Sequence, residues 1–204
     1  MRWLASAHTQ AGNSSAAREL HAESVALNEQ TAGPLALARA LRVAGEDELE
    51  LGDAPRAVEL IESALALVRS GGHEREVVMA LHSLGDAYLV SGDTARARRS
   101  YVEALAHGGD AMTVTDSAHC LAGLAAVAAR EQRPEISARL WNAVAAYERD
   151  VGGRLIYPHA RRRYAAEVRP DEANGFAEAV DEEGELTLEG ATALALDALG
   201  EPPG

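Results

Sequence analysis

The sequence repeats itself every 40 residues. Gly12, Gly52 and Gly92 are separated by this interval, and Gln132 follows at the next step. Two further columns keep the same register, one of small residues and one of mostly large residues. The small column is Ala17, Ala57, Ala97 and Ser137, and the large column is His21, Ile61, Tyr101 and Trp141. A register kept over four copies predicts an array of similar structural units.

Each unit is predicted to be a hairpin of two helices. In the copy from Leu81 to Ala104, two helical stretches flank Gly92 and Asp93. Glycine adopts the positive φ that ends many helices, and the residue that follows can cap the next helix. Small residues at Gly85 and Ala97 would let the two helices pack closely. Because one hairpin cannot bury its apolar faces alone, the hairpins are expected to stack.

The third copy resembles the tetratricopeptide repeat (TPR) family and its pattern LxxLGxxYxxxGDxxxAxxxYxxAL. The matching residues are Leu81, Leu84, Gly85, Tyr88, Gly92, Asp93, Ala97, Tyr101, Ala104 and Leu105. The second copy has Glu48 where an aromatic residue is usual, and the period exceeds the roughly 34 residues of the family. The resemblance implies an all-α fold, a right-handed superhelical stack of four hairpins closed by C-terminal capping helices.

The expected repeat array covers residues 1–151, with hairpins at 1–30, 32–70, 73–108 and 112–151, and residues 152–204 form a helical cap and tail. Ser14 or Ser15 should cap the second helix. The cap should contain helices at 158–168 and 170–180, a loop at 181–185, a last helix capped by Thr187 and a frayed end, and cover the fourth hairpin. Because the chain begins within a first helix, we expect an upstream domain or a lost repeat, and an apolar surface at Trp3 and Leu4.

The last roughly 80 residues resemble the C-terminal end of large ATP-binding bacterial regulators of the LuxR and SARP families. The resemblance rests on LAGLAAVAAREQRPEISARLWNAV, GGRLIYPHARRRY and GELTLEGATALAL. The chain departs from these families in a shortened segment at 171–176. It also lacks the phosphate loop GxxxxGK[ST], since it contains no Lys. Their nucleotide and DNA functions are therefore not implied here.

Composition excludes several classes of function. A net charge of −13 argues against a nucleic-acid surface over the whole chain. The cluster of Arg residues at 154–169 could neutralise phosphates, but the acidic run at 171–189 is expected to offset it. The single cysteine, Cys120, fits a reducing cytoplasm, and no apolar run approaches the roughly 20 residues that span a membrane. We expect a cytoplasmic protein without direct nucleic-acid or membrane contact.

The first helices of stacked hairpins line a concave surface, which in TPR proteins commonly binds a peptide or partner helix. By repeat register, the candidate binding residues are Arg39, Arg42, Glu46, Met79, His82, Asp86 and His119. Arg39 and Arg42 lie one turn apart and could hold a carboxylate bidentately. The alternative is that they pair with Glu46 on a solvated helix face.

No catalytic site or cofactor site is predicted. His82 and Asp86 share a helical face, and with His119 a site of two His and one carboxylate can be drawn. Such pairs often arise by chance, so we expect a surface pair and no metal. Cys120 is expected to fill core space. Motifs such as GxSxG and HExxH, which would place a nucleophile or a base, are absent.

The sequence therefore predicts a non-catalytic interaction domain that belongs to, or derives from, a bacterial transcriptional or signalling regulator. It would bind a protein or peptide segment in its concave groove. Two alternatives stay open. The groove could enclose a small ligand and signal to an attached ATPase or DNA-binding domain, which requires an enclosed apolar pocket. Alternatively, the first repeat could form a homodimer.

Overall fold

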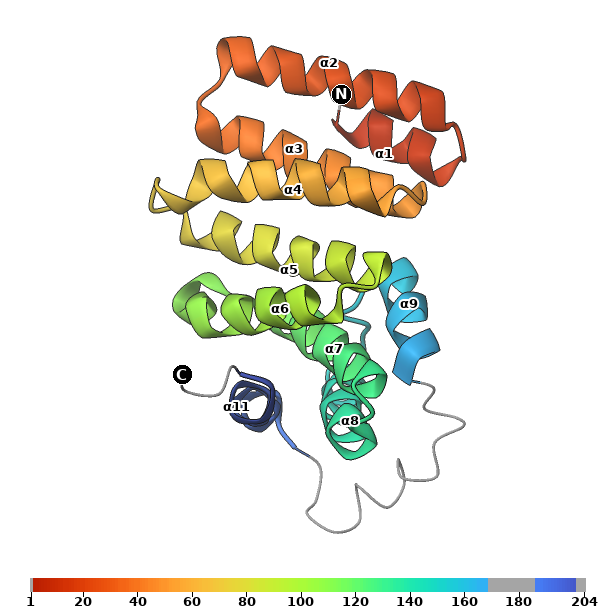
Figure 1. Cartoon of the computed structure of the whole chain (residues 1–204), viewed down its shortest axis with the longest axis vertical. Coiled ribbons are helices and arrows are strands. Elements are labelled where there is room, and N and C mark those ends of the chain that lie inside the picture. The colour runs from red at the N-terminus through yellow and green to blue at the C-terminus, as the bar shows by residue number, and fades with distance from the viewer. Residues whose placement is uncertain (1, 169–185, 201–204) are drawn as a thin grey trace. The chain divides into compact units, whose positions relative to one another are not determined.

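The computed structural model describes residues 2–168 and 186–200, and all regular secondary structure in these ranges is helical (Figure 1). The all-α prediction is confirmed. The chain divides into two compact units, Met1–Asp93 and Thr94–Gly204. The predicted helix at 170–180, the loop at 181–185 and the frayed end at 201–204 lie outside the described residues.

The first unit consists of stacked antiparallel helices. In chain order these are α1 (Arg2–Gln10), α2 (Ser14–Thr31), α3 (Pro34–Glu50), α4 (Ala54–Arg69) and α5 (Glu74–Ser91). Each helix packs against the next one, from α1 through α5. The first helices of successive hairpins also touch directly, α1 against α3 and α3 against α5. These direct contacts create a line along which side chains of two repeats meet.

The second unit surrounds α7 (Val114–Arg130). The helices α6 (Thr94–Gly108), α8 (Pro134–Asp150) and α9 (Pro158–Val168) all pack against it, and a short 3₁₀ helix, η1 (Gly109–Ala111), follows α6. The last described helix, α11 (Leu188–Leu199), packs across α6, α7 and α8. Helices from the C-terminal segment therefore pack on the fourth hairpin, as predicted. The division into an array ending at residue 151 and a separate cap stays a prediction.

The 40-residue period is visible in the backbone as a repeated left-handed turn. The turn residues have positive φ angles, 76° at Gly12, 85° at Gly52, 86° at Gly92 and 58° at Gln132. In the second repeat, the N–H of Gly52 donates a hydrogen bond to the Leu49 carbonyl at 3.2 Å. The N–H of Asp53 donates to the Glu48 carbonyl at 2.9 Å. The same pair of bonds recurs at the three other turns. This is the Schellman motif, which satisfies carbonyls left open at a helix end.

Helix starts agree with the sequence at most positions. The Thr187 side chain accepts a hydrogen bond from the Gly190 N–H at 3.1 Å, so the predicted cap of the last helix is confirmed. The predicted cap at Ser14 or Ser15 is wrong, because Asn13 holds the N-cap position. The N–H of Asn13 completes the Schellman turn on the His8 carbonyl, and the helix begins directly afterwards.

The small and large columns form the packing surfaces between helices. All members of both columns are buried. A methyl group added at Gly45 of α3 would lie 2.5 Å from Ile61 Cγ1 of α4. One added at Gly123 of α7 would lie 2.4 Å from Cζ of Tyr101 in α6. Such distances are too short for two carbon atoms, so glycine at these positions lets a bulky neighbour reach the opposing backbone.

The turn at Gln132 provides a test of the shared geometry. Gln132 is a non-glycine residue in the left-handed region, where a Cβ atom is strained. We expect Gln132→Gly to raise the free energy of unfolding by about 0.5–1 kcal/mol, after allowing for the greater chain entropy of glycine. Thermal and urea unfolding would measure the change. Gln132→Ala is the matched control and should give no gain; a lower stability for Gln132→Gly would contradict the assignment.

Candidate interaction surface

Six of the seven predicted binding residues lie where α3 meets α5. We call this line the α3–α5 seam. Its contacts across the two helices are Arg39 with Glu76 and Glu46 with Ser83, and we include in it the predicted residues on the same two helices, Arg42 on α3 and Met79, His82 and Asp86 on α5. The seventh residue, His119, lies on α7 in the second unit. The seam is therefore the part of the predicted surface that the structure brings together.

Arg39 pairs across the seam with Glu76. Its Nε and Nη2 atoms lie 2.9 Å and 2.5 Å from Glu76 Oε1. The hydrogen bond from Glu76 raises the pKa of Arg39 above its ordinary value, so the guanidinium stays charged. The Arg39 side chain is 47% exposed. One face of this cation is therefore open to solvent.

Arg42 and Glu46 form a more enclosed cluster with Ser83. Arg42 Nη1 pairs with Glu46 Oε1 within one helix, and Ser83 Oγ of α5 donates to the same oxygen at 2.6 Å. The Arg42 side chain is only 11% exposed, whereas Glu46 is 38% exposed. Arg42 thus follows the predicted alternative of pairing with Glu46, but on a largely buried face. Arg39 instead pairs with the next repeat.

The remaining candidates do not converge on a metal site. His82 Nε2 lies 3.9 Å from Asp86 Oδ2, and both side chains are mostly buried. His119 is buried, and its Nε2 accepts the backbone N–H of Tyr157 at 3.4 Å. Within residues 2–168 and 186–200, no group of three or more His, Cys, Asp or Glu side chains is arranged to hold a metal ion. Cys120 is buried, as expected for a core residue.

Glu76 and Ser83 belong to the seam but were not among the predicted residues. Each lies 37 residues after its partner, Arg39 or Glu46. This separation is one helical turn shorter than the 40-residue period. A search for residues of complementary charge or hydrogen-bonding capacity 37 positions apart would have found both.

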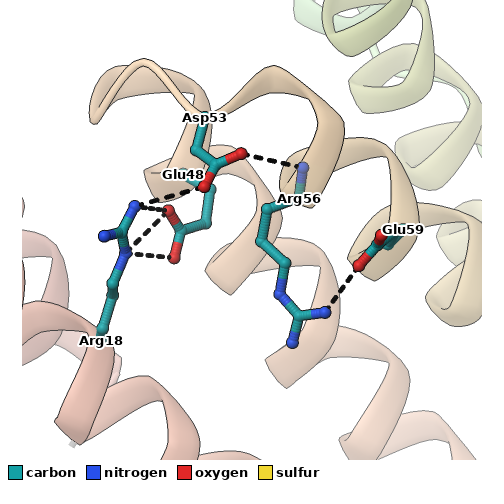
Figure 2. Close-up of polar contacts among 5 residues, drawn as sticks. All are labelled: Arg18, Glu48, Asp53, Arg56 and Glu59. Carbon is teal, nitrogen blue, oxygen red and sulfur yellow. Dashed lines mark hydrogen bonds and ion pairs between the residues drawn. The ribbon is translucent and has the colours of Figure 1, made fainter.

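A second group of charges joins α2 to α3 in the first unit (Figure 2). Arg18 of α2 makes three hydrogen bonds to the Glu48 carboxylate, at 2.7–3.1 Å, and its Nη2 lies 3.5 Å from Asp53 Oδ2. Beside them, His21 Nε2 lies 2.7 Å from Asp47 Oδ2. Glu48 is buried, so loss of its partner would leave a desolvated carboxylate. These charges hold two repeats together.

A buried carboxylate also organises the second unit. Glu148 of α8 accepts the backbone N–H groups of Leu155 and Ile156 at 2.9 Å and 3.3 Å. It also pairs with Arg161 of α9. The connection between α8 and α9 is therefore fixed by hydrogen bonds to a charged group, which are stronger than neutral ones.

Stacked helical hairpins with a shared left-handed turn and a polar seam between first helices define a helical-repeat protein. Residues 37–107 match the model of the tetratricopeptide repeat family. No curated protein gives a significant sequence match.

Two crystal structures of nearly identical TPR-like repeats, from a proposed kinesin light chain of Podosopora anserina, have similar folds. The first, a variant, is 20% identical, with a TM-score of 0.65, over 97% of this chain and 93% of the other. The second is 18% identical, with a TM-score of 0.65, over 98% and 95%. They confirm the predicted TPR-like solenoid fold. None of the described helices is long and apolar enough to cross a membrane.

The two kinds of charge pair should differ in their contribution to stability. Exposed ion pairs typically contribute less than about 1 kcal/mol, so a double-mutant cycle of Arg39→Ala and Glu76→Ala should give a coupling energy below that value. Glu148→Ala should lower the free energy of unfolding by about 3 kcal/mol, because Arg161 and two backbone N–H groups lose their acceptor. Urea unfolding would measure both. A larger coupling energy for Arg39 and Glu76 would show that the seam pair is structural.

Proposed function

We propose that this chain is a non-catalytic interaction domain that binds a partner protein segment along the α3–α5 seam. TPR repeats generally mediate the binding of protein partners. The observation that carries the proposal is the Arg39–Glu76 pair, which crosses from one repeat to the next and leaves the Arg39 side chain 47% exposed. Because about half of the Arg39 side chain is already in contact with water, a partner carboxylate can reach this cation at low cost.

The order of charges along α3 defines the chemistry of the partner. Arg39 and Arg42 lie one turn apart, and Glu46 lies one turn further on. A complementary segment carries a carboxylate near Arg39, followed by a hydrogen-bond donor or cation near Glu46. Met79 lies between these positions on α5 and offers an apolar, adaptable contact. Recognition would thus combine the exposed cation of Arg39, the hydrogen-bond acceptor of Glu46 and the apolar side chain of Met79.

We also propose that the domain belongs to, or derives from, a cytoplasmic bacterial transcriptional or signalling regulator. The support is the resemblance carried by the residues of α7, α8 and α11, including LAGLAAVAAR and GELTLEGATALAL. The single buried cysteine fits a reducing compartment. In such a regulator the domain would supply partner recognition, and other domains would supply nucleotide and DNA chemistry.

A charge swap tests the seam. Arg39→Glu combined with Glu76→Arg keeps an ion pair but reverses the polarity presented to a partner. A displayed library of random peptides would be selected on the wild-type chain, and the selected peptides measured on both proteins. We expect the swap to weaken binding about tenfold or more without changing the melting temperature.

The matched control is the swap Arg56→Glu with Glu59→Arg. Both members of this pair are on α4, which contributes no residue to the seam; they are exposed and joined at 2.7 Å (Figure 2). It should leave the affinity of the selected peptides unchanged. Peptides that bind all three proteins equally would exclude the seam as the binding surface.

Self-association through the first repeat is a second candidate function. Trp3 and Leu4 of α1 are 80% and 54% exposed. The residues in register with Leu4 in later repeats are Ala44, Leu84 and Leu124, and all of them are buried. On α3, the adjoining positions Asp47 and Glu48 contact α2, the second helix of the preceding hairpin. On α1, Trp3 and Leu4 are exposed instead, and a second copy of the chain would cover them.

Light scattering of the wild type beside Trp3→Glu/Leu4→Glu tests this candidate. If α1 forms the interface, the wild type should have twice the 21.5 kDa mass of one chain, and the variant should have the mass of a monomer. Both proteins should keep the same helical circular dichroism signal, because the substituted side chains are exposed. A folded monomer in both cases would exclude self-association and leave the seam as the interaction surface.

A further inference from the structure

The connection from α8 to α9 presents an exposed aromatic ring on a rigid base. Tyr157 is 62% exposed, although its backbone is fixed at both ends. Its N–H donates to His119 Nε2, and its carbonyl accepts the Arg161 N–H at 2.9 Å. The ring is stacked on His159, with centroids 5.8 Å apart and planes 9° apart. The ring of His119 lies 5.4 Å away on another element, α7.

The base beneath this ring is held by buried groups. Glu148 fixes the backbone of Leu155 and Ile156, and Ile156 is buried. Arg161 pairs with Glu148, and its guanidinium carbon lies 5.2 Å from the centroid of the Trp141 ring. Because these contacts already hold the backbone beneath Tyr157 in place, little conformational entropy would be lost when a partner binds its side chain.

The segment that carries the ring is rich in Arg, between Asp150 and Glu167. Residues 151–166 contain four Arg and no acidic residue, in a chain of net charge −13. Arg161 is committed to Glu148, and Arg163 is half-buried. Arg162 is exposed. The Arg154 side chain is 70% exposed, and its Nη1 makes a long contact of 3.5 Å with Glu148 Oε2. His159 stacks on Tyr157, and Arg162 lies one turn further along α9.

The geometry points to a second protein-binding surface, the Tyr157 patch, formed by Arg154, Tyr157, His159 and Arg162. Its partner is an acidic peptide segment that carries an aromatic or other large apolar side chain. The apolar group would pack on the exposed part of Tyr157, and its carboxylates would lie against Arg154 and Arg162. Tyr and Arg are the residue types that most often dominate binding energy at protein interfaces. This surface belongs to the second unit, whereas the α3–α5 seam belongs to the first, and the proposal does not depend on the seam.

An acidic peptide fits this surface better than nucleic acid does. The basic area is confined to a few residues, whereas the chain as a whole carries 32 acidic and 19 basic residues. An extended phosphate backbone would leave the patch and meet negative charge, which opposes binding. A short acidic segment can remain within the patch. Its association should weaken as salt concentration rises, since the contacts with Arg154 and Arg162 are exposed.

Fluorine NMR on the full chain labelled with 3-fluorotyrosine tests the proposal. The chain has five Tyr residues, and Tyr157 is the strongly exposed one among them. The probe is a short synthetic peptide in which Glu and Asp residues flank one Trp. We expect the Tyr157 signal, assigned with Tyr157→Phe, to shift on titration while the other four signals stay in place. Arg162→Glu should weaken binding about tenfold, and Arg56→Glu, a similar reversal elsewhere, should not.

Each contrary result identifies a different error. No shift of the Tyr157 signal at millimolar peptide would overturn the proposal, as would equal loss of affinity with Arg162→Glu and Arg56→Glu. The same peptide with Ser in place of Trp should bind more weakly; if it binds equally, Tyr157 is not a contact. A stronger response to oligothymidylate than to the peptide would make the patch a nucleic-acid surface. Unchanged melting of Arg162→Glu would show that the variant is folded.

Discussion

The left-handed turn that recurs every 40 residues is the constraint on which the hairpins depend. Each turn reverses the chain between two antiparallel helices and satisfies the last carbonyls of the first helix with two N–H groups. Because its position relative to the small columns is constant, Gly45 of α3 comes to face Ile61 of α4. A turn displaced by one residue would rotate the next helix by about 100° and turn its small side chains away from the contact. The period of the sequence is thus a period of the backbone.

Successive repeats are joined by different chemistry in the two units. In the second unit, Tyr101 of α6 packs closely against the backbone at Gly123 of α7, and this contact depends on shape complementarity. In the first unit, the corresponding large position is His21, which pairs with Asp47, and Arg18 binds Glu48. The residue that departs from the TPR pattern at position 48 is therefore matched by a compensating cation. The polar contact between α2 and α3 requires a specific geometry, but it buries less apolar surface than the contact between Tyr101 and Gly123 does.

Much of the fold could be predicted from sequence, because helix ends and core columns depend on local conformation and on periodicity. Pro34, Pro134 and Pro158 mark helix starts within a residue of the structure. The cross-repeat pairs could not be predicted in this way. The pairing of Arg39 with Glu76 depends on how far one repeat is displaced along the next, which a period alone does not contain. Likewise, the contacts of Glu148 with Leu155, Ile156 and Arg161 arise in a segment where the repeat register has ended.

The charged residues of this chain therefore fall into two groups with different consequences for function. Glu48 and Glu148 are buried and multiply hydrogen-bonded, so their partners are fixed by the cost of an unpaired buried charge. Arg39 and Arg162 lie at the surface, where water already competes for them. Exchange of such surface charges requires little energy, whereas the buried charges keep the backbone beneath them in place. A binding surface on a repeat scaffold needs an accessible charge and a backbone that is held in place beneath it. The seam and the Tyr157 patch each combine an exposed cation with such a backbone.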